Sequence, residues 1–158
     1  MSELALYENV PQEVIEDENR YIVFKVGNEF YAIDVSYVDN IIQMPVITRV
    51  PTAPKCFKGI INLRGEIIPI MSLSRRMNSV EDTISQKSSV IILDMGEGKF
   101  MGVTVDEVKE VLTLRDSDIE EPSPFLKKAV TLVKGVAKKE DELISIIETG
   151  ALLDREIA

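Results

Sequence analysis

The residue types that most often perform chemistry in proteins are scarce in this chain. It contains no histidine, so the commonest general base and the commonest transition-metal ligand are both missing. Its single cysteine, Cys56, can form neither an intrachain disulfide nor a structural zinc site, which fits a reducing cytoplasm. Residues 96–99, Gly-Glu-Gly-Lys, lack the spacing and the following Ser or Thr of a phosphate-binding loop. We therefore expect no enzyme activity, no metal and no cofactor.

One short stretch, Asn62-Leu63-Arg64-Gly65, has residue types that are better suited to binding a partner. It separates two apolar runs, 58–63 and 66–71, that are typical of strands. An ordinary hairpin turn would use Asn-Gly or Asp-Gly, so Leu63 and Arg64 call for another explanation. Arginine is enriched among the residues that dominate binding energy at interfaces. The alternative is that Leu63 is a core residue and Arg64 a solvated side chain.

The composition narrows the range of partners. The 158 residues, 45% of them hydrophobic, are enough for one domain or for two small barrels that share a core. The formal net charge of −9 argues against nucleic acid and against anionic lipid, since both require a basic surface. No apolar run is long enough to span a membrane, and the N-terminus lacks the pattern of a signal peptide. We expect no direct membrane insertion.

The elements that would position the Arg64 stretch are mostly short strands. Residues 1–19 carry six acidic side chains and predict a flexible acidic arm, and residues 154–158 a C-terminal tail. Pro69 has no N–H to donate, so its strand should be an edge at that point or turn away from its neighbour. The apolar patterns predict hairpins over 21–35 and 90–105, strands near 38–42, 58–63, 66–71, 108–113, 131–137 and 142–147, an extended crossing over 45–54, an acidic linker over 116–121, and short helices within 74–87 and 151–153.

The two halves of the chain resemble each other. A shift of 70 residues places 30–42 on 100–112 with three identities, Phe, Val and Val, and mostly apolar or small residues elsewhere. A shift of 76 then places 58–61 on 134–137 and 66–70 on 142–146. Two windows in the same order, with one loop-sized adjustment, indicate two copies of a unit of about five strands.

The repeat predicts a mainly β fold of two SH3-like five-stranded barrels that share an apolar core. The first barrel would span about 20–75 and the second about 88–150, with strand exchange between them allowed. The second copy also provides a comparison for the turn. Asn62-Leu63-Arg64-Gly65 aligns with the fully charged Lys138-Lys139-Glu140-Asp141, so the strands themselves do not require Leu and Arg.

Three segments, KGIINLRGEIIPIMSL (58–73), NEFYAIDVSYVDNII (28–42) and FMGVTVDEVKEVLTL (100–114), resemble the CheW family of bacterial chemotaxis. The likeness covers about 20–153. It implies a non-enzymatic cytoplasmic adaptor that couples the tip of a methyl-accepting chemoreceptor to the CheW-like regulatory domain of the histidine kinase CheA. It also implies that further CheW copies can join rings within membrane-bound receptor arrays.

The resemblance assigns roles to individual residues. Those implied in kinase binding are Ile47, Lys58, Arg64, Gly65 and Ile67, and those implied in receptor binding are Val35, Val38, Asn40, Gly59, Arg64, Val103 and Val105. The family has a glutamate where this chain has Asn40, so the expected ion pair with Arg64 is replaced by at most one hydrogen bond. Asp39 should point to the opposite face of its strand.

Other interpretations remain open on the sequence alone. Ile33, Val35, Val38, Val103 and Val105 could line a groove between the barrels for the receptor's helical hairpin, or they could simply fill the core. The chain could serve a sensory kinase outside chemotaxis. It could also be a double-barrel protein that binds a small molecule.

Overall fold

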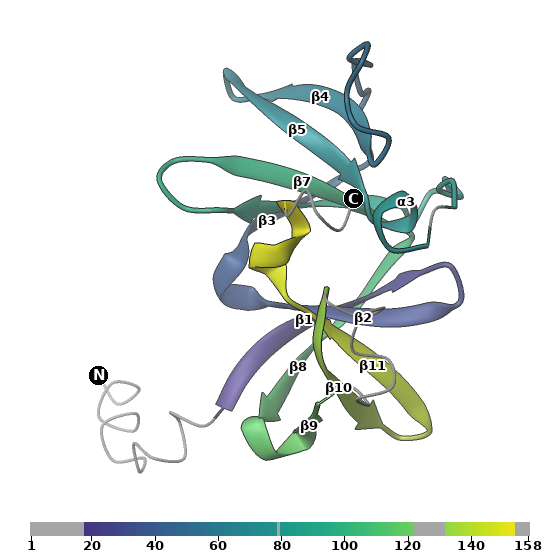
Figure 1. Cartoon of the computed structure of the whole chain (residues 1–158), viewed down its shortest axis with the longest axis vertical. Helices are drawn as coiled ribbons and strands as arrows, with labels where there is room; N and C mark the ends of the chain where they lie inside the picture. Colours follow the sequence, from purple (N-terminus) through teal and green to yellow (C-terminus); the bar gives the residue numbers. More distant parts are fainter. Residues whose placement is uncertain (1–17, 79, 122–131, 154–158) are drawn as a thin grey trace.

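The fold is built from two β-sheets with short helical segments between them (Figure 1). The computed structural model describes residues 18–78, 80–121 and 132–153. The acidic arm predicted for 1–19 lies outside these ranges, apart from residues that begin the first strand, and so does the tail 154–158. The described residues are mainly strand, as the sequence predicts.

Sheet A has six strands in the order β8-β1-β2-β11-β10-β9, and sheet B has five in the order β3-β6-β7-β5-β4. The strands of sheet A are β1 (Glu18–Val26), β2 (Glu29–Asp34), β8 (Glu107–Arg115), β9 (Ile119–Glu120), β10 (Val133–Lys139) and β11 (Glu142–Ile147). Those of sheet B are β3 (Val38–Gln43), β4 (Phe57–Leu63), β5 (Glu66–Ser72), β6 (Ser89–Asp94) and β7 (Phe100–Val105). The helical segments are η1 (Val35–Tyr37), α3 (Leu73–Asn78), η2 (Asp116–Asp118) and η4 (Thr149–Leu153).

Each sheet combines strands from both halves of the chain. In sheet A, the β1–β2 hairpin pairs with strands of the second half, and in sheet B the β6–β7 hairpin pairs with strands of the first half. If each strand of sheet B is replaced by its counterpart in the repeat, the order becomes β8-β1-β2-β11-β10, which is the order of sheet A without β9. The two units therefore have the same architecture, and each contains strands from both halves of the chain.

One apolar cluster, here called the shared core cluster, contains residues from both sheets. Strands such as β1 and β6 bury both of their faces, one in this cluster and the other in a cluster of their own sheet. In β6, Ile91 and Leu93 join the shared core, whereas Val90 and Ile92 join a second cluster that belongs to sheet B. Burial on both faces explains why these strands are nearly continuous apolar runs. The shared core cluster comprises Ile22, Phe24, Val26, Tyr31, Ile33, Met71, Leu73, Ile91, Leu93, Met101, Val103, Val105, Leu132, Ile147 and Leu152.

Pro69 interrupts pairing along one side of β5. The strand pairs with β4 through Pro69 itself, opposite Ile60, but its parallel ladder with β7 begins only at Ile70. At Pro69 the strand is thus an edge on the β7 side, as the missing N–H predicts. In the second copy, Ser145 replaces the proline and pairs with Tyr31 of β2.

Hydrogen bonds connect the C-terminal segment η4 to α3, which lies in the first half of the chain. The buried Arg76 side chain donates from Nε to the Leu152 carbonyl oxygen at 3.0 Å and from Nη2 to that of Ala151 at 3.4 Å. Leu152 is itself part of the shared core cluster. In the described part of the chain, no helix is both long and apolar enough to cross a membrane.

Candidate functional site

The Arg64 hairpin is a two-residue turn between β4 and β5. Leu63 pairs with Glu66, which leaves Arg64 and Gly65 as the loop. Both loop residues have positive φ, 54° and 85°, as a type I′ turn requires. Asn62 supports the turn because its Oδ1 accepts a hydrogen bond from the Gly65 backbone N–H at 3.1 Å. The sequence thus presents Arg64 at the tip of a rigid hairpin.

The backbone conformation of Arg64 is unusual for a residue with a side chain, at a cost of about 1 kcal/mol or more. The aligned residue of the second copy, Glu140, has nearly the same φ of 57°. Both turns therefore have the same strained backbone conformation. They differ in the side chain at that position, which is arginine in the first copy and glutamate in the second. Arg64 is exposed, and its guanidinium makes no hydrogen bond or ion pair with any residue that the structure describes.

Leu63 has a structural role. It is half-buried and packs against the sheet B cluster of Ile61, Ile68, Ile70, Val90 and Ile92. Of the two interpretations of the Leu-Arg pair, the core interpretation therefore holds for Leu63. Arg64 is the member that remains available for a partner.

Asn40 lies on β3 with its side-chain amide turned partly inward. A β-bulge precedes it, since Val38 pairs with Leu93 and Asn40 with the adjacent Ile92. Its Oδ1 is buried and has no hydrogen-bond partner among the described residues. The hydrogen bond from Arg64 that would replace the family's ion pair is thus not formed. Asp39 is exposed, in keeping with its expected position on the other face.

The residues that the resemblance implies in kinase binding differ in accessibility. Ile67 is 61% exposed, which is unusual for isoleucine in a strand. Ile47 is half-buried against the sheet B cluster. Lys58 is only 17% exposed at its side chain, and its Nζ lies 2.9 Å from Asp82 Oδ2. Asp82 also accepts a hydrogen bond from Thr104 Oγ1 at 3.2 Å, so Lys58 belongs to a structural network.

Gly59, which the resemblance implies in receptor binding, is buried and holds a close backbone crossing. A Cβ at this position would lie 2.1 Å from the Thr48 carbonyl oxygen. The extended crossing approaches β4 here through two backbone hydrogen bonds between Thr48 and Ile60, of 2.9 and 2.8 Å. Gly135 does the same in the second copy, where Glu120 of β9 pairs with Val136. The glycine of the repeated Lys-Gly is therefore explained by packing.

The valines expected in a receptor groove fall into two groups. Val103 and Val105 are 0% and 2% exposed and belong to the shared core cluster, so the groove contact expected of them does not fit their positions. Ile33 is fully buried in the same cluster. Val35 and Val38 are half-buried at its margin, where they can reach both the core and a partner.

Other exposed apolar residues in this half of the chain were not singled out as site residues from the sequence. Val46 is 93% exposed, Ile41 39% and Val50 38%. Val46 follows Pro45 in the extended crossing, and this proline-flanked position was the signal available in the sequence. Ile41 and Ile67 each have an exposed counterpart in the repeat, Val111 and Leu143.

The chemistry available to this surface is that of binding. Within residues 18–78, 80–121 and 132–153, no group of three or more His, Cys, Asp or Glu side chains is arranged to hold a metal ion. The surface instead offers an uncompensated cation, Arg64, on a rigid turn and exposed apolar side chains such as Ile67. These are the features of a protein-docking surface.

The fold and this surface define a double-sheet β scaffold for binding other proteins. The family model described as "CheW-like domain" matches residues 20–156. The chain belongs to this CheW-like family.

Individual relatives agree with the family match over nearly their whole length. The chain is 34% identical over 143 residues to the chemotaxis protein CheW of Bacillus subtilis, covering 90% of this chain and 91% of that protein. It is 31% identical over 160 residues to the chemotaxis protein CheW of Klebsiella aerogenes, covering 99% and 93%. The crystal structure of the scaffolding protein TtCheW from Thermoanaerobacter tengcongensis superposes with a TM-score of 0.80 at 33% identity, covering 89% of this chain and 90% of that one.

Proposed function

We propose that this chain is a non-enzymatic adaptor of bacterial chemotaxis that couples chemoreceptors to the histidine kinase CheA. The observation that carries the proposal is the intact Asn62–Gly65 turn, with Arg64 exposed and unpaired among the described residues, in a chain that matches the CheW-like model over 20–156. An adaptor works through differential binding of two partners and needs no bond chemistry. It would act in the cytoplasm, at receptor arrays held in the membrane.

The kinase would bind to the rim of sheet B. Arg64 is the anchor there, Gly65 fixes its turn, and Ile67 and Ile47 supply apolar contact. Lys58 supports this rim through Asp82, since its side chain is largely covered. The CheW-like regulatory domain of CheA is the expected partner, and further copies of this chain could occupy equivalent positions in a ring.

The receptor tip would bind near β3 and η1. Val35, Val38 and Asn40 are the half-buried residues on this margin, whereas Gly59, Val103 and Val105 act from within by holding the packing. Asn40 would contact the receptor through its accessible atoms, because its Oδ1 is buried.

The test is a charge reversal at Arg64 with its counterpart in the repeat as the control. Arg64→Glu should leave the fold intact and weaken assembly with receptor and kinase by about 2 kcal/mol, roughly 30-fold in affinity. Glu140→Arg changes charge at the matching turn and should be nearly neutral. Normal binding of both partners by Arg64→Glu would show that the proposal for this turn is wrong, whereas unfolding would make the residue structural.

A further inference from the structure

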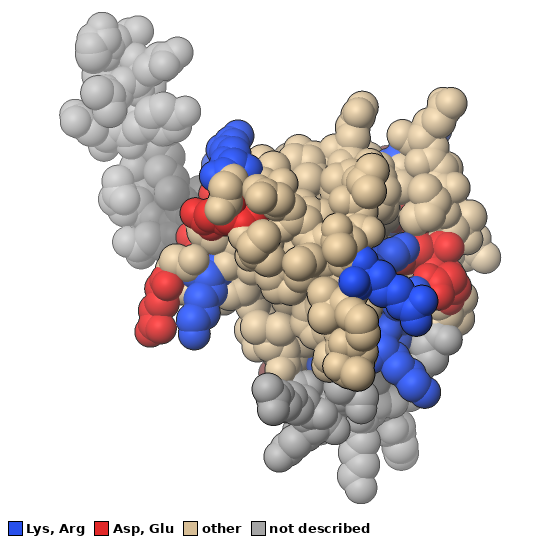
Figure 2. All heavy atoms as spheres, turned by 90° about the horizontal axis from the view of Figure 1, so that it is seen from above, with Lys and Arg blue, Asp and Glu red and all other residues tan. Residues whose placement is uncertain are grey.

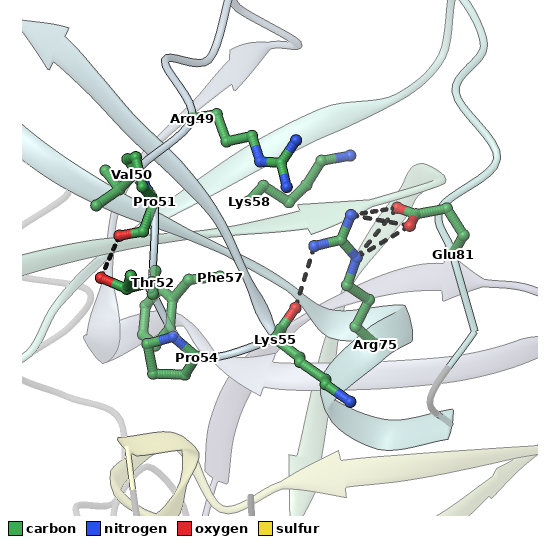
Figure 3. A pocket seen from close by; sticks show the side chains of 11 residues that line it. Arg49, Val50, Pro51, Thr52, Pro54, Lys55, Phe57, Lys58, Arg75 and Glu81 are labelled. Carbon is green, nitrogen blue, oxygen red and sulfur yellow. Dashed lines mark hydrogen bonds and ion pairs between the residues drawn. The ribbon is translucent and has the colours of Figure 1, made fainter.

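A basic groove lies beside the extended crossing, and the proposed function uses only one of its lining residues, Lys58. It has a volume of about 750 Å³ and is lined by eleven residues, Arg49, Val50, Pro51, Thr52, Ala53, Pro54, Lys55, Phe57, Lys58, Arg75 and Glu81 (Figure 3). Four of these are cationic and one is acidic, in a chain whose formal net charge is −9. The local excess of positive charge is therefore opposite in sign to that of the whole molecule.

The groove has a charged side and an apolar side. Figure 2 shows Lys and Arg side chains next to Asp and Glu on two opposite sides of the face seen from above, with other residues between them. In the groove itself, the cationic side chains face a proline-rich segment with Val50, Pro51 and Pro54, and Phe57 closes this side. A groove with both surfaces suits a peptide that carries acidic and apolar residues.

Two consecutive acidic residues of the chain already pair with cations that line this groove. Glu81 forms a bidentate pair with the Arg75 guanidinium, with its oxygens 2.8 Å from Nη2, and Asp82 Oδ2 lies 2.9 Å from Lys58 Nζ. Arg75 is oriented in addition by its Nη1 bond to the Lys55 carbonyl oxygen at 3.1 Å. The Glu81 contact shows that the Arg75 side of the groove can hold a carboxylate.

The two contacts differ in how easily they could be exchanged. The Asp82 side chain is 4% exposed and is locked by Lys58 and Thr104, whereas the Glu81 side chain is 65% exposed. An exposed ion pair contributes little to stability, so an incoming carboxylate could replace Glu81 on Arg75 at small cost. Arg49 and Lys55 line the same groove and have no ion pair with any described residue, which leaves them available for further carboxylates.

We propose that this groove binds a carboxylate-rich peptide segment of a partner protein, and that Glu81 is a displaceable internal competitor for it. One carboxylate of the segment takes the place of Glu81 on Arg75, and others bind Arg49 and Lys55. Apolar residues of the segment pack on Val50 and Phe57. The proposal does not depend on which protein supplies the segment, and it extends beyond the turn of Arg64.

The experiment measures binding of a fluorescein-labelled peptide of alternating Glu and Leu to the full-length chain by anisotropy. Glu81→Gln removes the competing charge and should tighten binding about two- to fivefold. Arg49→Gln should weaken it about tenfold, because it removes a charge-assisted bond. Lys138→Gln, an exposed lysine on β10 of the other sheet, is the matched control and should leave binding unchanged. Melting temperatures of all variants establish that the fold is kept.

Three outcomes would overturn the proposal. Unchanged or weaker binding by Glu81→Gln would show that Glu81 does not compete for the groove. Equal weakening by Arg49→Gln and Lys138→Gln would show non-specific attraction to surface charge. Displacement of the peptide by millimolar inorganic phosphate, as efficient as by unlabelled peptide, would indicate a general anion site instead of a site for acidic peptide.

Discussion

Replacement of Gly59 by alanine should destabilise this protein more than any glycine-to-alanine change on its surface. A Cβ at Gly59 would lie 2.1 Å from the Thr48 carbonyl oxygen and 2.8 Å from its carbon, both in backbone that cannot rotate away. The φ of 148° is also in a region that residues with a Cβ rarely adopt. The extended crossing would have to move away from β4 by about 1 Å to restore ordinary contact.

The loss in the free energy of unfolding can be worked out from the interactions that this movement would break. Thr48 and Ile60 exchange two backbone hydrogen bonds, of 2.9 and 2.8 Å, and each contributes about 1 kcal/mol net. The unfavourable φ at Gly59 adds more than about 1 kcal/mol. We expect a loss of about 3 kcal/mol in the free energy of unfolding, a large fraction of the 5–15 kcal/mol typical of a domain.

Two other glycines calibrate the measurement by urea denaturation. Gly150→Ala should be nearly neutral, because nothing lies within 4 Å of its added Cβ. Gly135→Ala should be intermediate, because its nearest neighbour is a side-chain atom, Ile119 Cγ2 at 2.3 Å, and the backbone contact with the Glu120 carbonyl oxygen, at 3.0 Å, is less severe than that of Gly59. If Gly59→Ala were as stable as Gly150→Ala, the close crossing would be refuted, and a direct receptor contact by Gly59 would again need to be considered.

Three further changes test local interactions. Asp82→Ala leaves Lys58 without its buried partner and should lower the free energy of unfolding by about 3 kcal/mol in denaturant titrations. An unchanged free energy of unfolding would show that the pair is dispensable. Asn40→Leu removes a buried oxygen that lacks a partner and should raise stability by about 1 kcal/mol, whereas a loss would reveal an interaction of Asn40 with solvent. The hydrogen bonds from Arg75 lower the pKa of Glu81 from its ordinary 4.5, so this pair stabilises the fold above pH 4.5 and is lost as the pH falls through the lower folded-state value. Melting temperatures of Glu81→Gln and the unmodified chain should converge in acid, and a constant difference would contradict the assignment.

The strands were largely predictable because their apolar patterns are strong and because glycine and polar residues identify the turns between them. The hairpins over 21–35 and 90–105 correspond to β1–β2 and β6–β7, and the helix expected within 74–87 is α3. The exchange of strands between the halves was not determined by the sequence. Both copies carry the same apolar periodicity, so a strand fits the equivalent place in either unit, and only the structure shows which it occupies.

The site was predictable only where chemistry and a turn coincide. Arg64 is exposed on an identifiable hairpin turn, as its type and position predict. Ile67 came only from the family resemblance, because its type alone predicts burial, whereas it is exposed. The placement of Val103 and Val105 in a groove failed because β7 is buried on both faces, so alternation cannot separate a core face from a binding face. The basic groove was not predicted, because its cationic residues come from separate segments of the sequence. Taken singly, each of them is typical of a solvated surface side chain.

We propose that the exposed Arg64 turn couples two partners. The most direct measurement is reconstitution of the purified full-length chain with a chemoreceptor tip fragment and CheA, followed by ternary complex formation and kinase autophosphorylation. We expect a ternary complex that changes autophosphorylation with the unmodified chain and with Glu140→Arg, and a roughly 30-fold weaker complex with Arg64→Glu. Equal assembly and equal kinase regulation by all three proteins would contradict it.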